Sequence, residues 1–261
     1  MVLGKCFVTM GCAFLMATGG LLGTNPGLIV ESLDAPSTSG GLRIHAGDVL
    51  LGWTLEKEVP ANIKSGRFET IWDWKWFQKE IAPRGTLALL ISRAGQHLKV
   101  DLDAETLKEV GVRPNMGEML LASYALGLEK LEAGDVEGGT AIWFEMEGED
   151  DLKQWLTLRA AEAYGRRGKY EKELELMDRA QAQVIGANAR LCVFMIHSIR
   201  LWRLENLDSA SKVASLWYEQ SKLEPESLVF AGCLSLLGNL ARSRGDFDLA
   251  EKYHESSRGN P

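Results

Sequence analysis

A polar break, usually with a glycine, recurs through the second half of the chain, and its spacing constrains the fold more than any other feature. The breaks lie at positions 134, 168, 205 and 245, which are 34, 37 and 40 residues apart. Between them, apolar residues recur at spacings of three and four, the period of amphipathic helices. A helix–turn–helix unit of this length buries its apolar stripe only by stacking on its neighbours. We therefore expect an α-solenoid of about four helical hairpins over residues 115–261.

The last unit, Leu237 to Tyr253, shows the pattern most clearly. Gly238 and Ala250 supply small side chains where two helices cross closely, and Gly245 makes the turn. These units resemble tetratricopeptide (TPR) repeats, and the stretch from Ser227 to Tyr253 resembles the longer kinesin-light-chain-like variant. The other units keep less of the pattern: the first has Gly127 and Gly134, the second has Ala161, Tyr164 and Gly168, and the eroded third has Leu201, Asp208 and Ala210.

The TPR resemblance implies that the first helix of each pair lines a concave groove that binds a protein or peptide. Asn239 occupies a position that often bonds a peptide backbone, and arginine holds a carboxylate through two parallel hydrogen bonds. The alternative is that these are ordinary polar surface residues without a ligand. The side chains placed in the groove are Glu162, Arg166, Trp202, Arg203, Asn239 and Arg242.

Residues 27–106 are predicted to form a small β-rich domain, so that the fold class is α+β. The alternating stretch 27–33 indicates a strand, residues 69–81 have the length of a helix, and residues 87–102 indicate two strands joined by a tight turn. The domain resembles a PDZ domain of the bacterial kind. The matching residues are Gly41-Leu42, Gly47-Asp48-Val49-Leu50, Gly85, Arg93 and Gly95.

The PDZ resemblance implies a groove in which a peptide C-terminus adds as a strand. We place Gly27, Leu28, Ile29, Trp72 and Trp76 in that groove. In PDZ domains, a glycine-rich loop begins the strand that precedes the counterpart of the Gly27 strand. Here, only the short stretch 19–23 could form that loop. The alternative is that the domain is a spacer, or that it contacts its own chain.

The apolar segment 1–26 allows two interpretations. Its one charge is Lys5, and a long apolar run follows it. This pattern is compatible with a signal peptide or membrane anchor, which would place the protein in the cell envelope or periplasm. Alternatively, the segment is a strand or the cut edge of a larger domain, and the protein is cytoplasmic. Residues 107–114 are predicted to be a linker between the two domains.

The sequence offers little that could carry out catalysis. Its formal net charge of −7 argues against nucleic acid as a partner, because phosphate binding needs a basic face. It contains no P-loop, no nucleophile elbow and no zinc-protease motif. The four histidines are scattered over separate elements, and no cysteine has metal-ligand spacing. We therefore expect no catalytic residue, no metal and no cofactor.

These observations predict a non-enzymatic scaffold that binds a protein or peptide partner through the TPR-like groove, with the PDZ-like domain as a further surface. The alternative is a regulatory part of a larger enzyme. The PDZ–TPR order resembles bacterial multidomain proteins that also carry a CHAT-type protease or a kinase domain. Membrane association would depend on the segment 1–26.

Overall fold

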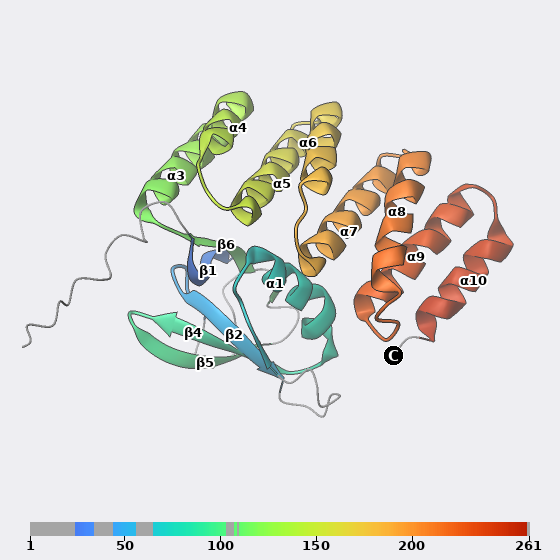
Figure 1. Ribbon diagram of the computed structural model, residues 1–261, viewed down its shortest axis with the longest axis horizontal. Coiled ribbons are helices and arrows are strands. Elements are labelled where there is room, and N and C mark those ends of the chain that lie inside the picture. The colour runs from blue at the N-terminus through green and yellow to red at the C-terminus, as the bar shows by residue number, and fades with distance from the viewer. Residues whose placement is uncertain (1–23, 34–43, 56–64, 103–106, 109, 260–261) are drawn as a thin grey trace, which may run out of the picture.

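The computed structural model describes residues 24–33, 44–55, 65–102, 107–108 and 110–259. Most of the predicted signal or anchor segment, residues 1–23, lies outside this part. Figure 1 shows a β-rich domain beneath an array of helical hairpins, and the hairpins follow one another from one end of the array to the other. The predicted α+β class, with a helical repeat part after the β-rich part, is confirmed at this level.

The strands of the β-rich domain form one antiparallel sheet. Its order is β5-β4-β2-β1-β6, and a short strand, β3, pairs with part of β2. Alternate residues of β4 point into the core, where Leu87, Leu89 and Ile91 are fully buried. The strands are β1 (Thr24–Leu33), β2 (Val49–Leu55), β3 (Ser65–Arg67), β4 (Leu87–Arg93), β5 (Gln96–Leu102) and β6 (Val110–Met116).

Strand β6 occupies most of the range predicted to be a linker. It pairs antiparallel with β1, with Leu33 opposite Val110 and Leu28 opposite Pro114. Proline and glycine in this range favour a linker over a strand, but an edge strand tolerates proline because one side of its backbone needs no ladder hydrogen bond. Since Val110, Pro114 and Met116 are all buried, β6 belongs to the core of the sheet domain.

The predicted helix over residues 69–81 begins as α1 (Ile71–Trp76). Thr70 caps it, and the Asp73 side chain reaches back to the Thr70 backbone N–H, which forms a capping box. The helix continues as a π-helical turn, η1 (Phe77–Ile81), and a 3₁₀ turn, η2 (Ala82–Arg84). Trp72 and Trp74 are buried although a spacing of two puts them on opposite faces, so α1 is enclosed on two sides, and Trp76 is half-buried.

Four helical hairpins form the rest of the described chain, in agreement with the predicted number. Three of the predicted breaks turn at a glycine with positive φ, at positions 134, 168 and 245. The third break has no glycine, and Glu205 itself takes the left-handed conformation there (φ 59°), at a cost of about 1–2 kcal/mol. The hairpins are α3 (Glu118–Glu132) with α4 (Val136–Glu145), α5 (Asp150–Arg166) with α6 (Tyr170–Ala182), α7 (Ala187–Arg203) with α8 (Leu207–Ser221), and α9 (Leu228–Ser243) with α10 (Phe247–Arg258).

The breaks also start the second helix of each pair. Asp135, Asn206 and Asp246 each accept a hydrogen bond from a backbone N–H three residues later, which satisfies an N–H that the helix leaves unpaired. A residue suited to a left-handed turn, followed directly by a capping residue, therefore marks three of the four hairpins in the sequence.

Close crossing of paired helices explains two of the small residues. A Cβ atom at Gly127 would lie 2.2 Å from the Trp143 indole nitrogen, and one at Gly238 would lie 2.7 Å from the His254 ring. Ala250 is almost fully buried. The predicted role of Gly127 and Gly238 at close helix crossings is thus confirmed.

His197 of α7 is buried against α6. Its Nδ1 is 2.9 Å from the Gln181 side-chain oxygen, and its Nε2 is 3.7 Å from the Asp178 carboxylate. Burial lowers the pKa of His197, because a charged ring loses its hydration, and Asp178 opposes this only in part. The folded protein therefore holds this histidine neutral.

We expect the stability of the array to fall as the pH drops below about 6.5, the ordinary histidine pKa. In that range the unfolded chain takes up a proton at His197 that the folded chain resists, so the stabilisation is complete above it and is lost below it. Urea unfolding at pH 7.5 and pH 5.5 checks this. His197→Gln should lose part of the pH dependence, whereas His97→Gln, at an exposed position, should keep it. Identical pH profiles for wild type and His197→Gln would contradict the assignment.

Candidate partner-binding surfaces

The strand edge predicted to accept a peptide is occupied on both sides. Leu28 pairs with Leu50 of β2 and with Pro114 of β6, and Ile29 pairs in the same way with Val49 and Arg113. Leu28 and Ile29 thus have a partner strand on each side, so an added strand cannot bind at these two positions. This corrects the prediction that a peptide pairs with β1, because β6, about 80 residues away in the sequence, already occupies that side of the strand.

The β-rich domain docks against the first helices of the hairpins, through α1. Figure 1 shows α1 beneath the array, next to α7. The Asn188 side chain, at the start of α7, donates a hydrogen bond to the Asp73 carboxylate (3.3 Å). Lys75 of α1 is enclosed, and burial lowers its pKa while the Glu162 carboxylate opposes that shift. Part of the inner face of the array is therefore taken by the chain's own domain.

A second contact joins η1 and η2 to the start of α9. The Glu80 carboxylate is buried, forms an ion pair with Arg84 and accepts a hydrogen bond from the Val229 backbone N–H (3.0 Å). Arg84 also donates to the Glu226 carbonyl (3.1 Å). A buried carboxylate at a helix N-terminus is stabilised by the unpaired N–H groups and the helix dipole. These bonds connect segments that are more than 140 residues apart in sequence.

The six predicted groove residues do not form one site. Glu162 and Arg166 form an ion pair (2.6 Å) on α5 and line a cavity beside α3. Arg242 lines a different cavity, formed with α10. Trp202 is half-buried against the core formed by α7, α8 and α9, Arg203 is exposed and Asn239 is half-buried. Of the six, only Glu162 and Arg166 line the same cavity among the described ones.

The cavity between α3 and α5 has a volume of about 320 Å³. Its apolar lining includes Leu128, Leu131 and Ala163, and Trp143 lies at its base. Its charged lining combines three arginines with two glutamates: Arg159, Arg166, Arg167, Glu132 and Glu162. Such a mixture of apolar surface and a few convergent polar groups is typical of a binding site.

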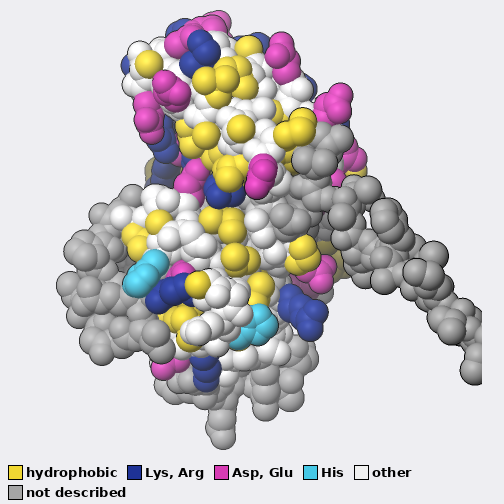
Figure 2. All heavy atoms as spheres, turned by 90° about the vertical axis from the view of Figure 1, so that its left-hand side faces the viewer, with side chains coloured by type: hydrophobic (Ala, Val, Ile, Leu, Met, Phe, Trp, Pro, Cys, Tyr) yellow, Lys and Arg dark blue, Asp and Glu magenta, His cyan; other side chains and the backbone are white. Residues whose placement is uncertain are grey.

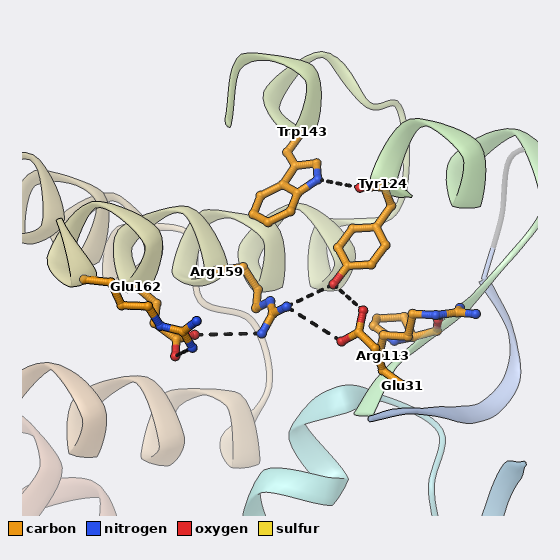
Figure 3. A network of polar contacts seen from close by, with 8 residues as sticks. Glu31, Arg113, Tyr124, Trp143, Arg159 and Glu162 are labelled. Carbon is orange, nitrogen blue, oxygen red and sulfur yellow. Dashed lines mark hydrogen bonds and ion pairs between the residues drawn. The ribbon is translucent and has the colours of Figure 1, made fainter. Parts of the chain in front are cut away.

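A polar network fixes one wall of this cavity (Figure 3). The Tyr124 hydroxyl donates to Glu31 of β1 (2.7 Å), and Arg159 donates to the same hydroxyl (3.1 Å). Arg159 also lies 3.7 Å from Glu31 and 3.9 Å from Glu162. Burial disfavours the charge on Arg159, but Tyr124, Glu31 and Glu162 outweigh it and raise the pKa of Arg159. The network thus holds the cavity in place relative to the sheet.

Tyr124 is held from its other side as well. Its ring stacks on the Trp143 indole, with centroids 5.4 Å apart, and the Trp143 Nε1–H donates to the Tyr124 carbonyl (3.1 Å). Burial raises the pKa of Tyr124, so the hydroxyl stays protonated and acts as the donor to Glu31. Neither Arg159 nor Tyr124 was predicted from the sequence. The one available signal for Arg159 was its position three residues before Glu162, on the same helix face.

The end of the array at the first hairpin exposes apolar side chains. Figure 2 shows this end of the molecule, where hydrophobic side chains gather above the β-rich domain. On α3, Met119 and Leu126 are 55% and 50% exposed. The terminal repeats of solenoids usually present a polar outer face, so these exposed apolar side chains depart from that pattern.

Within the described residues, no group of three or more His, Cys, Asp or Glu side chains could hold a metal ion. None of the described helices combines the length and the apolar character that a membrane span needs. Cys192 and Cys233 are buried as free thiols, and desolvation raises the pKa of each to about 12.

No protein-family model matches the chain, and no curated protein matches it. Among solved structures, a Podosopora anserina kinesin light chain with nearly identical TPR-like repeats is 15% identical over 54% of this chain and 73% of its own, with a TM-score of 0.44. BtubC (BKLC) from P. vanneervenii is 18% identical over 52% of this chain and 59% of its own, with a TM-score of 0.42. MamA AMB-1 is 17% identical over 54% of this chain and 72% of its own, with a TM-score of 0.38. Since these scores are below 0.5, the description of the chain as a β-rich domain followed by helical hairpins rests on its own geometry.

Proposed function

We propose that the chain is a non-enzymatic scaffold that binds an extended segment of a protein partner in the cavity between α3 and α5. The observation that carries this proposal is the position of the cavity. It opens between the first helices of two hairpins, beside the part of the inner face that α1 covers, and it combines Leu128 and Leu131 with Arg166.

The chemistry of the lining favours a particular kind of segment. The cavity volume is at the lower end of the usual range for ligand sites, so it suits one or two side chains and not a whole domain. An apolar side chain would contact Leu128 and Leu131, and an acidic group next to it would bind Arg166 or Arg167, since a guanidinium holds a carboxylate with two parallel hydrogen bonds.

The test starts from a phage-displayed library of random peptides selected on the full chain. Enriched peptides should combine apolar and acidic residues. Ala163→Trp, which fills the cavity, should weaken their binding at least tenfold, as measured by fluorescence anisotropy. Ala182→Trp, at an exposed position on α6, is the matched control and should leave the affinity unchanged.

Arg166→Glu provides a second variant in case Ala163→Trp perturbs folding, because the Arg166 side chain is 71% exposed. It should weaken the binding of acidic peptides and leave the thermal unfolding temperature within about 2 °C of wild type. If both cavity variants bind the selected peptides as tightly as wild type, the cavity is not the binding site.

A second candidate is strand addition on β6. The support is the strand order: β6 stands at the end of the described order, paired with β1, and it contacts α1. Pro114 removes one backbone donor from β6, which weakens this candidate. Peptides that lose binding when their C-terminal carboxylate is amidated, yet tolerate Ala163→Trp, would favour β6 over the cavity.

A further inference from the structure

A second cavity, of about 770 Å³, lies where the β-rich domain meets the array. It is separate from the cavity between α3 and α5 and shares no lining residue with it. Its walls come from β2, β3, α1 and the turns after it, from the start of α7, and from the α8–α9 loop at residues 224–227. Cavities at domain interfaces are frequent ligand sites, because two surfaces can direct polar groups at one place.

Two tryptophans give this cavity an aromatic lining. Trp53 of β2 and Trp76 of α1 both line it. The Trp53 indole lies against Gly66 of β3, where a Cβ atom would be only 2.6 Å from the indole nitrogen. Trp53 also packs on Phe77, with ring centroids 5.5 Å apart, so its ring is held in position. Trp76 is half-buried, which leaves part of its ring accessible from the cavity.

The charges around the cavity are mostly negative. Four carboxylates and two guanidinium groups line it: Asp73, Glu80, Glu224, Glu226, Arg67 and Arg84. Asp73 is engaged in the cap of α1 and with Asn188, and Glu80 pairs with Arg84. Glu224 and Glu226 belong to the α8–α9 loop, and both side chains are exposed at the rim of the cavity. Four carboxylates against two guanidinium groups leave an excess of negative charge, so a ligand that enters meets aromatic rings and a negative lining.

We propose that this cavity receives a cationic side chain, arginine or lysine, from a protein partner. The cation would lie over the Trp76 ring and pair with Glu224 and Glu226. Tryptophan is the aromatic side chain that attracts cations most strongly, and a guanidinium can stack on the ring while it binds a carboxylate. This site goes beyond the proposed function, because it does not depend on the cavity between α3 and α5.

The test uses the full chain labelled with 5-fluorotryptophan and a titration with N-acetyl-arginine amide, followed by ¹⁹F NMR. The Trp53 and Trp76 resonances are assigned from Trp53→Phe and Trp76→Phe. We expect the arginine amide to shift the Trp76 resonance saturably, and N-acetyl-glutamate amide to leave it in place. The double variant Glu224→Gln/Glu226→Gln should bind the arginine amide at least threefold more weakly.

Glu171→Gln/Glu255→Gln is the matched control, since it removes two exposed carboxylates elsewhere on the array, and it should bind as wild type does. Three results would overturn the proposal: no saturable shift at Trp76, an equal shift with the glutamate amide, or unchanged affinity in Glu224→Gln/Glu226→Gln. Because the cavity between α3 and α5 is untouched in this experiment, these results are distinguishable from a failure of the proposed function.

Discussion

Replacing Glu80 by alanine is expected to lower the free energy of unfolding by about 3 kcal/mol and to loosen the β-rich domain from the array. The Glu80 carboxylate is buried, and it is the shared partner of Arg84 and of the Val229 N–H. Without it, Arg84 keeps a largely buried charge with no carboxylate, and the start of α9 keeps an uncapped N–H. The loss is therefore much larger than that of a surface ion pair, which contributes about 0–1 kcal/mol.

Urea unfolding measures the loss of stability, and amide hydrogen exchange locates it. Exchange should accelerate at the start of α9 and in η1 before it does so in α3 or α4. Glu224→Ala is the matched control, because Glu224 lies in the same cavity wall but is exposed, and it should change the stability by less than 0.5 kcal/mol. Equal effects of Glu80→Ala and Glu224→Ala would show that this contact does not hold the domains together.

Gly127→Ala is expected to destabilise the chain by about 2–4 kcal/mol, although alanine is the better helix former by about 1 kcal/mol. The new Cβ atom would lie 2.2 Å from Trp143 Nε1 and 3.0 Å from the Gly139 carbonyl. The Trp143 indole cannot move away easily, because it stacks on Tyr124 and donates to the Tyr124 carbonyl. Helices α3 and α4 must therefore separate, and the polar network beside the cavity loses its support.

For Gly232→Ala, by contrast, no loss of stability is expected. Gly232 is exposed on α9, and a Cβ atom there would lie 3.6 Å from the Trp217 ring, an ordinary contact. This variant should be neutral or more stable by up to about 1 kcal/mol, since alanine restricts the unfolded chain and favours the helix. Both variants are compared by urea unfolding. If Gly127→Ala is as stable as Gly232→Ala, the close crossing of α3 and α4 does not exist in solution.

The features of the fold that the sequence revealed are local ones. The breaks near Gly134, Gly168 and Gly245 could be found because a turn residue and a following helix cap are neighbours in the chain. The eroded break at Glu205 could be placed by the repeat spacing, although not by its residue type. Gly127 and Gly238 could be recognised because a close helix crossing leaves a small residue at a fixed position in each repeat.

The features that escaped the sequence analysis depend on contacts between distant residues. The pairing of β6 with β1, and the burial of Glu80 at the start of α9, join segments about 80 and 150 residues apart. No periodicity in one segment indicates which distant segment it will meet. The docking of α1 against α7 is of the same kind.

The sequence predicted some residues of the candidate site and missed others. Glu162 and Arg166 were placed in the groove through the TPR resemblance, which puts them on the first helix of a hairpin. Arg159 and Tyr124 were missed because their role depends on Glu31, which belongs to the other domain. Conversely, Trp72 was predicted as a groove residue, but it is 3% exposed and forms part of the core.

The central claim, that a partner segment binds in the cavity between α3 and α5 while the β-rich domain covers the neighbouring inner face, is tested most directly by photo-crosslinking. A selected peptide carrying a photoreactive group is irradiated with the full chain, and mass spectrometry identifies the crosslinked residues. We expect crosslinks within residues 128–132 of α3 and 159–166 of α5. Crosslinks confined to β6, or to helices that do not line this cavity, would contradict the account.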